Sequence, residues 1–444
     1  MVRIGILSDT HVGRDIPKIV GEARRKAFRH AFREAVNILI NSDVDLVLHA
    51  GDLFEKKSMR SEDAVFVKDE FYRLVKNVKE RSVKDVNILI IRGNHDGTFL
   101  NSVLDYVTHP LADYFRVLEF DKETGLEGYY IDSNVAVIGV GYYPHIRSRF
   151  KNMLDDINSV FSSLESDLTR ILLIHNYIES ISNVPPSPQH TLIDLDDVMK
   201  LNLDIVVAGH YHERDNIINV GRGIKIIIPG ATEAIDLDEK GPFGVYIIDV
   251  DEEKNLDSRF IPIKPLQKIE IVKIYSEKPQ SIEWYKKRAV EEILRFAAKL
   301  YEERIQGILK IKLQGTLLEE KYVSKIFHEN ELEKIMKENP LLLFIDIEEN
   351  LKSIVSPAEY TAFKRFSREE LIRSVFKDVE EESVAEIVEE TTVALEEKGS
   401  ERTGLLKDSD RSIFVDKWVK IFLEKAEKIM EAERLKGEKN DRRS

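Results

Sequence analysis

The sequence predicts a layered α/β fold, followed by a small α+β domain and C-terminal helices. Three observations support this prediction. Short apolar runs, typical of buried strands, alternate with amphipathic helical segments through about the first 260 residues. Many of these runs end in a glycine or a ligand-type polar residue. The pattern then changes after two prolines, Pro262 and Pro265. Alternation of this kind favours sheets covered by helices.

The first part of the chain supplies helices and strands in this alternating order. Apolar residues recur at helical spacing in Glu22–Asn41 and Ser61–Val78. Strand-like apolar runs are Arg3–Ser8, Val44–His49, Val86–Ile91, Val135–Val140, Ile171–Ile174, Ile205–Ala208, Ile224–Ile228 and Gly244–Val250. Because sites in α/β sheets form outside the carboxyl ends of strands, the polar residues that follow these runs are the candidates for function.

The proline-containing stretch Ile261–Pro265 is a plausible domain boundary. After it, Lys268–Tyr275 alternates like a strand and Ile282–Glu303 is a strong helix candidate. The segments Gly307–Leu313 and Leu341–Ile347 are again strand-like. This order predicts a small α+β domain.

From Ser356 onward the chain is predicted to be helical. Ser367–Leu395 and Arg411–Lys436 are amphipathic and could form a helical hairpin. Far from the main core, their apolar faces need a partner or must cover one another. The acidic run Asp378–Glu397 is interpreted as a solvated face. The expected domains are therefore residues 1–265, 266–350 and 351–444.

Composition narrows the class of protein. A chain of 444 residues is too long for one core, and 43% apolar content supports a globular protein of two or three domains. The absence of cysteine excludes disulfides, thiolate metal sites and cysteine nucleophiles. The net charge of −14 argues against a nucleic-acid binder driven by bulk charge. It leaves a nuclease open, because bound divalent cations would supply local positive charge.

The sequence shows no signal-peptide pattern and no apolar run approaching 18 residues. We therefore expect a cytoplasmic, intracellular protein without membrane association. Richness in Lys, Glu and Ile, together with the lack of cysteine, suggests an archaeal or thermophilic source.

The strongest local signal is the segment Leu203–Glu213, where an apolar run is followed by Gly209, His210 and His212. Residues two apart in extended backbone point the same way, so both imidazoles can face one point. Neutral imidazole is the commonest protein metal ligand. Two histidines at this spacing are weak evidence for a metal site by themselves. However, four other strand ends upstream in the sequence also supply ligand-type residues.

Together these strand ends supply a ligand set made only of nitrogen and oxygen donors, which suits Mn, Fe, Zn or Mg. The set is Asp9, His11, Asp52, Asn94, His175, His210 and His212. Seven ligands exceed what one ion needs, and a bridging carboxylate would allow two ions about 4 Å apart. Such a pair can activate water near neutral pH and hold the oxygens of a phosphoester. His95, next to Asn94, is a natural general acid for the leaving oxygen.

Each motif also has a simpler explanation. Asp9, His11, Asp52 and Asn94 could be turn residues. His175 alone could be a buried structural histidine. The occurrence of five such strand ends in order favours the metal site. The remaining histidines, interpreted as structural or surface residues, are His30, His49, His109, His145, His190 and His328.

These motifs resemble those of the calcineurin-like metallophosphoesterases over about residues 1–265. They are Asp9-x-His11, Gly51-Asp52, Gly93-Asn94-His95-Asp96, His175 and Gly209-His210-x-His212. The segment Gly51-Asp52-Leu53-Phe54 and the order of the later domains are most similar to the Mre-eleven (bacterial SbcD) DNA-repair nucleases. The resemblance implies a layered metallophosphoesterase β-sandwich flanked by helices, then a capping domain and C-terminal helices.

The resemblance also implies a DNA nuclease with two Mn²⁺ ions in each copy of the chain. One ion would be held by Asp9, His11, Asp52 and His212. The other would be held by Asp52, Asn94, His175 and His210, with Asp52 bridging. His95 would protonate the leaving 3′ oxygen. The implied activities are 3′→5′ exonuclease on double-stranded DNA and endonuclease on single strands, during the processing of double-strand breaks.

The resemblance to this family also implies binding partners for this chain. A Rad-fifty-type SMC-like ATPase would bind the C-terminal helices, and the capping domain, Lys268–Asn350, would help to orient DNA. Ser61–Val78 and Phe99–Val107 match in position the helices through which the family forms homodimers. Simpler explanations are a capping domain that only adds stability, and helices that only pack on their own sheet or on each other. Glu55 departs from the family pattern and could repel substrate or orient His95.

Two other functions are compatible with the sequence. One is a phosphodiesterase or phosphatase acting on small phosphoesters, which the added domains after Pro265 disfavour. The other is a scaffold protein with a degenerate metal site, which the complete ligand set disfavours.

Overall fold

The structure is a computed structural model. It describes residues 1–353, apart from 56–58, 99–100, 109–110, 112, 121–127, 133, 166, 182–183, 186, 222 and 319–325. Residues 1–354 cluster into one compact unit. The predicted C-terminal helices, Ser367–Leu395 and Arg411–Lys436, lie outside the described residues. Within the described part, no helix is both long and apolar enough to cross a membrane.

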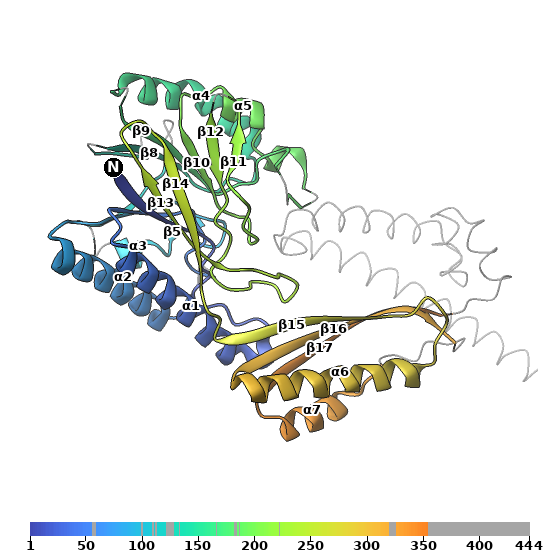
Figure 1. Cartoon of the computed structure of the whole chain (residues 1–444). Coiled ribbons are helices and arrows are strands. Elements are labelled where there is room, and N and C mark those ends of the chain that lie inside the picture. Colours follow the sequence, from blue (N-terminus) through green and yellow to red (C-terminus); the bar gives the residue numbers. More distant parts are fainter. Residues whose placement is uncertain are drawn as a thin grey trace, which may run out of the picture. The chain divides into compact units, whose positions relative to one another are not determined.

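Two six-stranded sheets form the centre of this unit (Figure 1). The first has the order β14-β13-β1-β2-β3-β6 and the second β11-β12-β10-β9-β8-β7. The strands of the first sheet are β1 (Val2–Leu7), β2 (Leu46–His49), β3 (Asn87–Ile90), β6 (Phe115–Val117), β13 (Gly244–Val250) and β14 (Leu256–Pro262). Those of the second are β7 (Tyr129–Ile131), β8 (Val135–Val140), β9 (Thr169–Ile174), β10 (Ile205–Ala208), β11 (Ile218–Val220) and β12 (Ile224–Ile227).

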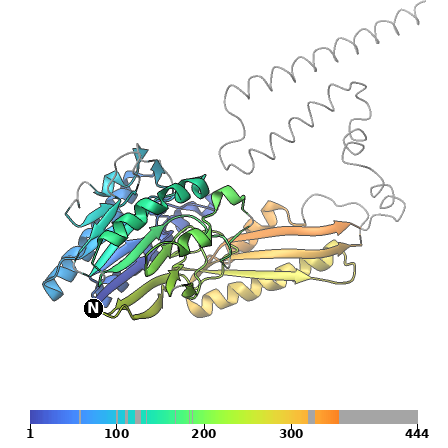
Figure 2. The ribbon, with the colours of Figure 1, turned by 90° about the horizontal axis from the view of Figure 1, so that it is seen from above.

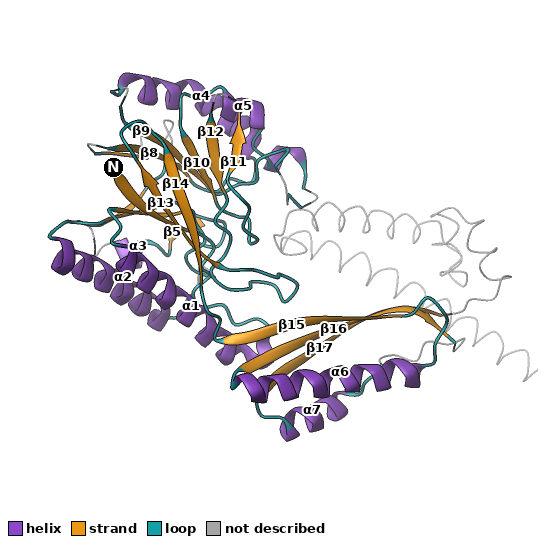
Figure 3. Ribbon diagram, viewed as in Figure 1, coloured by secondary structure: helices purple, strands orange, loops and turns teal. Residues whose placement is uncertain are grey.

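Helices cover the outer face of each of these two sheets, so the sheets and their helices form four layers (Figure 3). The first sheet packs against α1 (Gly21–Ser42) and α2 (Ser61–Ser82), and the second against α4 (Ile146–Ser163) and α5 (Leu195–Met199). The 3₁₀ turns η1 (Lys18–Val20) and η3 (Gln189–Thr191) precede α1 and α5. The predicted β-sandwich flanked by helices is confirmed.

The central strands are apolar on both faces because both faces are covered. In β2, Leu46 and Leu48 pack between the two sheets, whereas Val47 packs under α1 and α2. All three side chains are buried. Continuous apolar runs of this kind are typical of parallel strands inside layered folds.

The parallel pairing of these strands fixes where the site can form. β1, β2, β3 and β6 run parallel, and so do β8, β9, β10 and β12. The carboxyl ends of β1, β2 and β3 therefore lie at one edge of the first sheet, and those of β9 and β10 at one edge of the second.

A third sheet follows after Pro262 (Figure 2). It consists of β15 (Gln267–Tyr275), β16 (Gln306–Leu317) and β17 (Leu342–Ser353), all parallel. α6 (Ile282–Glu303) and α7 (Glu329–Glu338) pack against it. Ser281 begins α6, because its side chain accepts a hydrogen bond from the backbone N–H of Trp284. The small α+β arrangement agrees with the prediction, while the division at residues 265 and 350 stays a prediction.

The prediction of a helix at Phe99–Val107 is wrong for the described residues of this segment. Residues 97–102 contain the short strands β4 (Gly97–Thr98) and β5 (Asn101–Ser102), and α3 covers only Asp105–Thr108. Asp96 accounts for this, since its carbonyl oxygen accepts from Val103 N and Ser102 Oγ and closes the segment into a hairpin.

Truncation of a buried ring should report on the packing of α1 and α2 against the first sheet. Phe71 is fully buried, and its ring lies 5.3 Å from that of Phe32 and 5.5 Å from that of Phe115. We expect Phe71→Leu to lower the free energy of unfolding by about 1–2 kcal/mol, through lost contacts and a small cavity. Tyr301→Leu, at a position of α6 that is 49% exposed, is the control and should leave the melting temperature almost unchanged. Equal melting temperatures for both variants would contradict this layer assignment.

Candidate metal centre

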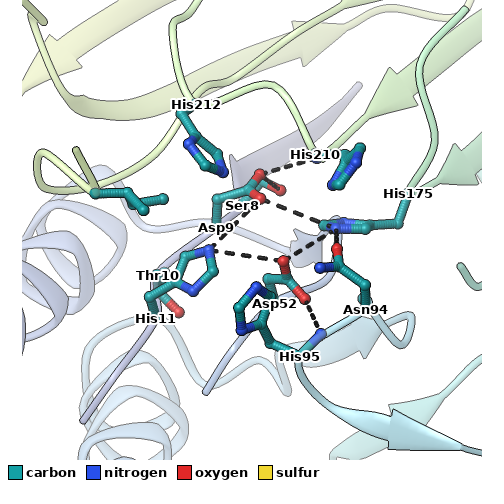
Figure 4. Close-up of polar contacts among 12 residues, drawn as sticks. Ser8, Asp9, Thr10, His11, Asp52, Asn94, His95, His175, His210 and His212 are labelled. Atoms are coloured by element: carbon teal, nitrogen blue, oxygen red, sulfur yellow. Dashed lines mark hydrogen bonds and ion pairs between the residues drawn. The ribbon is translucent and has the colours of Figure 1, made fainter. Parts of the chain in front are cut away.

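The structure brings all seven predicted ligand side chains together (Figure 4). Asp9 and His11 follow β1, Asp52 follows β2 and Asn94 follows β3. From the second sheet, His175 follows β9, and His210 and His212 follow β10. The carboxyl ends of the two sheets therefore face each other across this group of side chains.

The donor atoms fall into two groups. Ligand atoms of Asp9, His11 and His212 lie within 4.8 Å of one another, and so do those of Asp52, His175 and His210. Asp52 Oδ2 lies between the groups, 3.6 Å from His11 Nε2 and 3.3 Å from His175 Nε2. Asn94 Oδ1 is also 3.3 Å from His175 Nε2. Asp52 Oδ2 is thus the carboxylate oxygen that lies near both groups.

Three of the histidines are oriented through Nδ1 by an oxygen acceptor. The contacts are His11 Nδ1 to Glu55 Oε2 at 3.1 Å, His175 Nδ1 to the Ala50 carbonyl at 2.5 Å, and His212 Nδ1 to Glu239 Oε1 at 2.7 Å. Because such oxygens accept, each Nδ1 carries a proton, and each Nε2 is the nitrogen that could bind a cation once it is deprotonated. Metal-binding histidines in proteins are fixed in the same way.

The two aspartates are likewise held through one oxygen each. Asp9 Oδ2 lies 2.5 Å from Ser8 Oγ and accepts from the His210 backbone N–H at 3.1 Å. Asp52 Oδ1 accepts from the His95 backbone N–H at 2.8 Å. Among the described residues, Asp9 Oδ1 and His11 Nε2 have no hydrogen-bond partner, although both are buried and 3.9 Å apart. Buried polar atoms of this kind normally have a partner, so they fit a site for a cation.

The ligand side chains shift the pKa values of one another. Burial raises the pKa of Asp9 despite the opposing effect of His175 and His212. Burial also raises the pKa of Asp52, but His175 and His11 outweigh it and hold this pKa well below its usual range. Burial lowers the pKa of His175, whereas Asp52 and Asp9 raise it to about 9. Protons on His175 and His212 thus compensate the buried carboxylates, a role that divalent cations would take in their place.

The backbone at these strand ends adopts conformations that aim the side chains inward. Asp9, His11, Asp52 and His210 have positive φ angles of 49°, 39°, 55° and 75°. This left-handed region is costly for residues other than glycine, and such strain is concentrated at functional sites. Position 93 requires glycine, because its backbone lies against Asp52 and a Cβ atom there would collide with the Asp52 carboxylate.

Sequence reasoning did not assign a role to two acidic residues that support the group. Asp96 Oδ2 accepts from the backbone N–H groups of Gly93 and Leu53, and Asp96 Oδ1 from that of Phe54, so it joins the loops after β2 and β3. Glu239 orients His212 from a loop 27 residues further along the chain.

Glu55, noticed in the sequence as a departure from the family pattern, is a third supporting residue. Its carboxylate contacts His11 and accepts from Arg14 at 2.8 Å, whereas its backbone carbonyl accepts from His95 Nδ1 at 2.6 Å. The side chain therefore orients His11, and the backbone orients His95. With its Nδ1 proton bonded in this way, His95 has Nε2 for proton exchange.

Neutralising Glu55 should weaken metal binding without removing a ligand. We expect Glu55→Gln to raise the Kd for Mn²⁺ by about 10- to 100-fold, because His11 loses the negative charge that increases its basicity. Isothermal titration of the metal-free protein measures this constant. Glu179→Gln, which removes one of the two carboxylate partners of Arg147 in a half-buried ion pair, is the control. An unchanged Kd for Glu55→Gln would exclude Glu55 from the support of the site.

Comparisons with known proteins agree with this geometry. Residues 2–214 match the model of the calcineurin-like phosphoesterase family. The DNA double-strand break repair protein Mre11 of Saccharolobus solfataricus is 29% identical over 283 residues, which cover 61% of this chain and 66% of that protein. The protein of the same name from Methanosarcina mazei is 26% identical, over 59% of this chain and 39% of its own length.

A bacterial relative shows the same similarity. The SbcD component of the SbcCD nuclease of Staphylococcus epidermidis is 24% identical, over 51% of this chain and 61% of that protein. The chain therefore spans less than two thirds of the length of each of these relatives. The resemblance expected from the motifs is confirmed: residues 2–214 match the calcineurin-like phosphoesterase family, and the chain is similar to the Mre11 and SbcD proteins.

Proposed function

We propose that the chain is a manganese-dependent DNA nuclease that processes double-strand breaks. Its activities would be 3′→5′ exonuclease on double-stranded DNA and endonuclease on single strands. The convergence of seven nitrogen and oxygen donors from five strand ends is the observation that carries this proposal. The names of the relatives, a DNA repair protein and a nuclease component, support DNA as the substrate.

The proposed site holds two Mn²⁺ ions. Asp9, His11, Asp52 and His212 would bind one, and Asp52, Asn94, His175 and His210 the other. The separation of the donors into two groups and the position of Asp52 Oδ2 between them support this assignment. When bound, the two cations supply positive charge to a phosphodiester and lower the pKa of an attacking water molecule.

His95 is the proposed proton donor to the leaving 3′ oxygen. Its ring centroid lies 4.8 Å from that of His11, beside the donor groups. Its Nδ1 donates a hydrogen bond to the Glu55 carbonyl oxygen. Nε2 can therefore deliver a proton while Nδ1 keeps the ring oriented. Its backbone N–H meanwhile fixes the Asp52 carboxylate.

The wider organisation is also a proposal. Residues 1–265 would form the nuclease domain, residues 266–350 a capping domain that orients DNA, and residues 351–444 the region that binds a Rad-fifty-type ATPase. A homodimer through α2 is supported by its exposed apolar side chains, since Val65 and Tyr72 are 50% and 59% exposed. Co-purification of the ATPase should weaken when residues 411–444 are deleted.

One assay separates the leading function from its alternative. The purified chain is incubated with end-labelled linear duplex DNA, or with bis-p-nitrophenyl phosphate, in Mn²⁺, in Mg²⁺ or in a chelator. Degradation of the duplex in Mn²⁺ and its loss with the chelator support the nuclease. Hydrolysis of the chromogenic ester alone would instead favour an enzyme for small phosphoesters.

A further inference from the structure

The loop of residues 234–243 lies between the candidate metal centre and the third sheet. Glu239 Oε1 contacts His212 Nδ1 at 2.7 Å, and its Oε2 accepts from the backbone N–H of Ile235 at 2.7 Å. The carboxylate of Glu239 therefore joins the loop to the histidine. A displacement of this loop would displace the His212 ring.

The preceding residue of the loop is held by the third sheet. Asp238 Oδ2 lies 2.7 Å from Lys310 Nζ, and Asp238 Oδ1 lies 2.8 Å from Lys312 Nζ. Lys310 and Lys312 are two residues apart on β16, so they point to the same face. Glu348 of β17 lies 3.5 Å from Lys310 and 3.6 Å from Lys312. Lys310 is only 8% exposed, which limits the positions that this network can take.

Other contacts hold the beginning of the loop, but its end borders a cavity. Arg14 Nε donates to the Ile235 carbonyl at 2.8 Å, and Arg24 donates to the Ala234 carbonyl and to Gln267 at the start of β15. Residues 232–234 and 239–243 line a cavity of about 430 Å³, together with residues of the segment 263–271. Beside this space, the contacts of Asp238 with the two lysines tie the loop to the third sheet.

We propose that the third sheet positions His212, through the chain of contacts from Lys310 and Lys312 to Asp238 and from Glu239 to His212. The affinity of the group Asp9, His11 and His212 for its ion thus depends on a domain that supplies none of the ligands. Lys310, Lys312 and Asp238 are positioning residues, since they act through Glu239. The inference rests on the proposed metal site.

The test is a titration of metal-free protein with Mn²⁺, in which electron paramagnetic resonance counts the free ion. We expect two sites in the unsubstituted chain. Asp238→Asn should weaken one of them by about 3- to 10-fold and leave the other unchanged, as for a residue coupled to a site that it does not touch. Glu239→Gln, which acts directly on His212, should weaken the same site by about 10- to 100-fold.

Lys299→Met is the matched control. Lys299 makes an ion pair of similar length with Glu270, at 2.6 Å, but this pair lies within the third sheet and α6. We expect the Mn²⁺ affinities of this variant to equal those of the unsubstituted chain. A merely structural network would lower the melting temperatures of the metal-free Asp238→Asn and Lys299→Met proteins alike and leave both affinities unchanged.

The double variant Lys310→Met/Lys312→Met approaches the same contact from the other side. Its effect on Mn²⁺ affinity should not add to that of Asp238→Asn in the triple variant, because both remove one interaction. If Asp238→Asn fails to fold, this double variant still tests the inference. Two unchanged sites in both variants would overturn the inference and leave the metal site standing. Absence of Mn²⁺ binding in the unsubstituted chain would overturn the proposed function as well.

Discussion

Replacement of Asp52 by asparagine should reduce cleavage of DNA by about 10³-fold or more. Asp52 Oδ2 lies within 3.6 Å of the ligand nitrogens of both His11 and His175, so it is the donor shared by the two groups. Asparagine preserves the shape and one oxygen, but it removes the negative charge that both cations would share. The rate of duplex degradation in saturating Mn²⁺, and the number of ions bound, are the two measurements.

The control for this variant is Asp249→Asn. Asp249 of β13 contacts Arg3 at 2.7 Å near the amino end of β1, whereas the ligands follow the carboxyl ends of their strands. The control should keep two Mn²⁺ sites and full activity, with at most a small fall in melting temperature. Full binding and cleavage by Asp52→Asn would remove this residue from the site and make the two-ion arrangement untenable.

Replacement of His95 by asparagine should separate catalysis from metal binding. General acid catalysis contributes about 10²- to 10⁴-fold, so we expect kcat on DNA to fall by that factor. The affinity for Mn²⁺ should stay within about threefold, because the backbone N–H that fixes Asp52 remains. Both quantities are measured on the same preparation.

The leaving group provides a sharper distinction. A 3′ alkoxide needs a proton as it departs, whereas p-nitrophenolate does not. His95→Asn should therefore hydrolyse bis-p-nitrophenyl phosphate at nearly the unsubstituted rate while it fails on DNA. An equal loss on both substrates would show that His95 acts on the metal centre rather than on the leaving oxygen.

Periodicity was sufficient to predict the larger elements of the fold. α6 and β8 have the predicted bounds, because both are long apolar patterns with clear ends. α4 was not predicted, although Ile146, Phe150 and Ile157 follow helical spacing. Its first residue follows His145, which makes no side-chain cap, so no start signal marks it. β6, β7 and β11 have three residues each, too few for a period to be visible.

The candidate site shows a similar division. Ligand types at the ends of apolar runs were visible because parallel strands bring such ends to one edge. The residues that orient the ligands were not visible, since their roles depend on tertiary contacts. Glu239 belongs to no recognisable sequence motif, and only the folded chain brings it into contact with His212. Glu55 was noticed as a departure from the family, but its contacts with His11 and Arg14 could not be foreseen.

The origin of the donors in two separate sheets has a consequence for stability. Asp9, His11, Asp52 and Asn94 come from one sheet, and His175, His210 and His212 from the other. Ions bound as proposed would cross-link the halves of the sandwich. Chelation would then lower the cooperativity of unfolding and hasten amide exchange in β9 and β10, the strands that lead to His175 and His210. The cations proposed to act on DNA would then also hold the two sheets together.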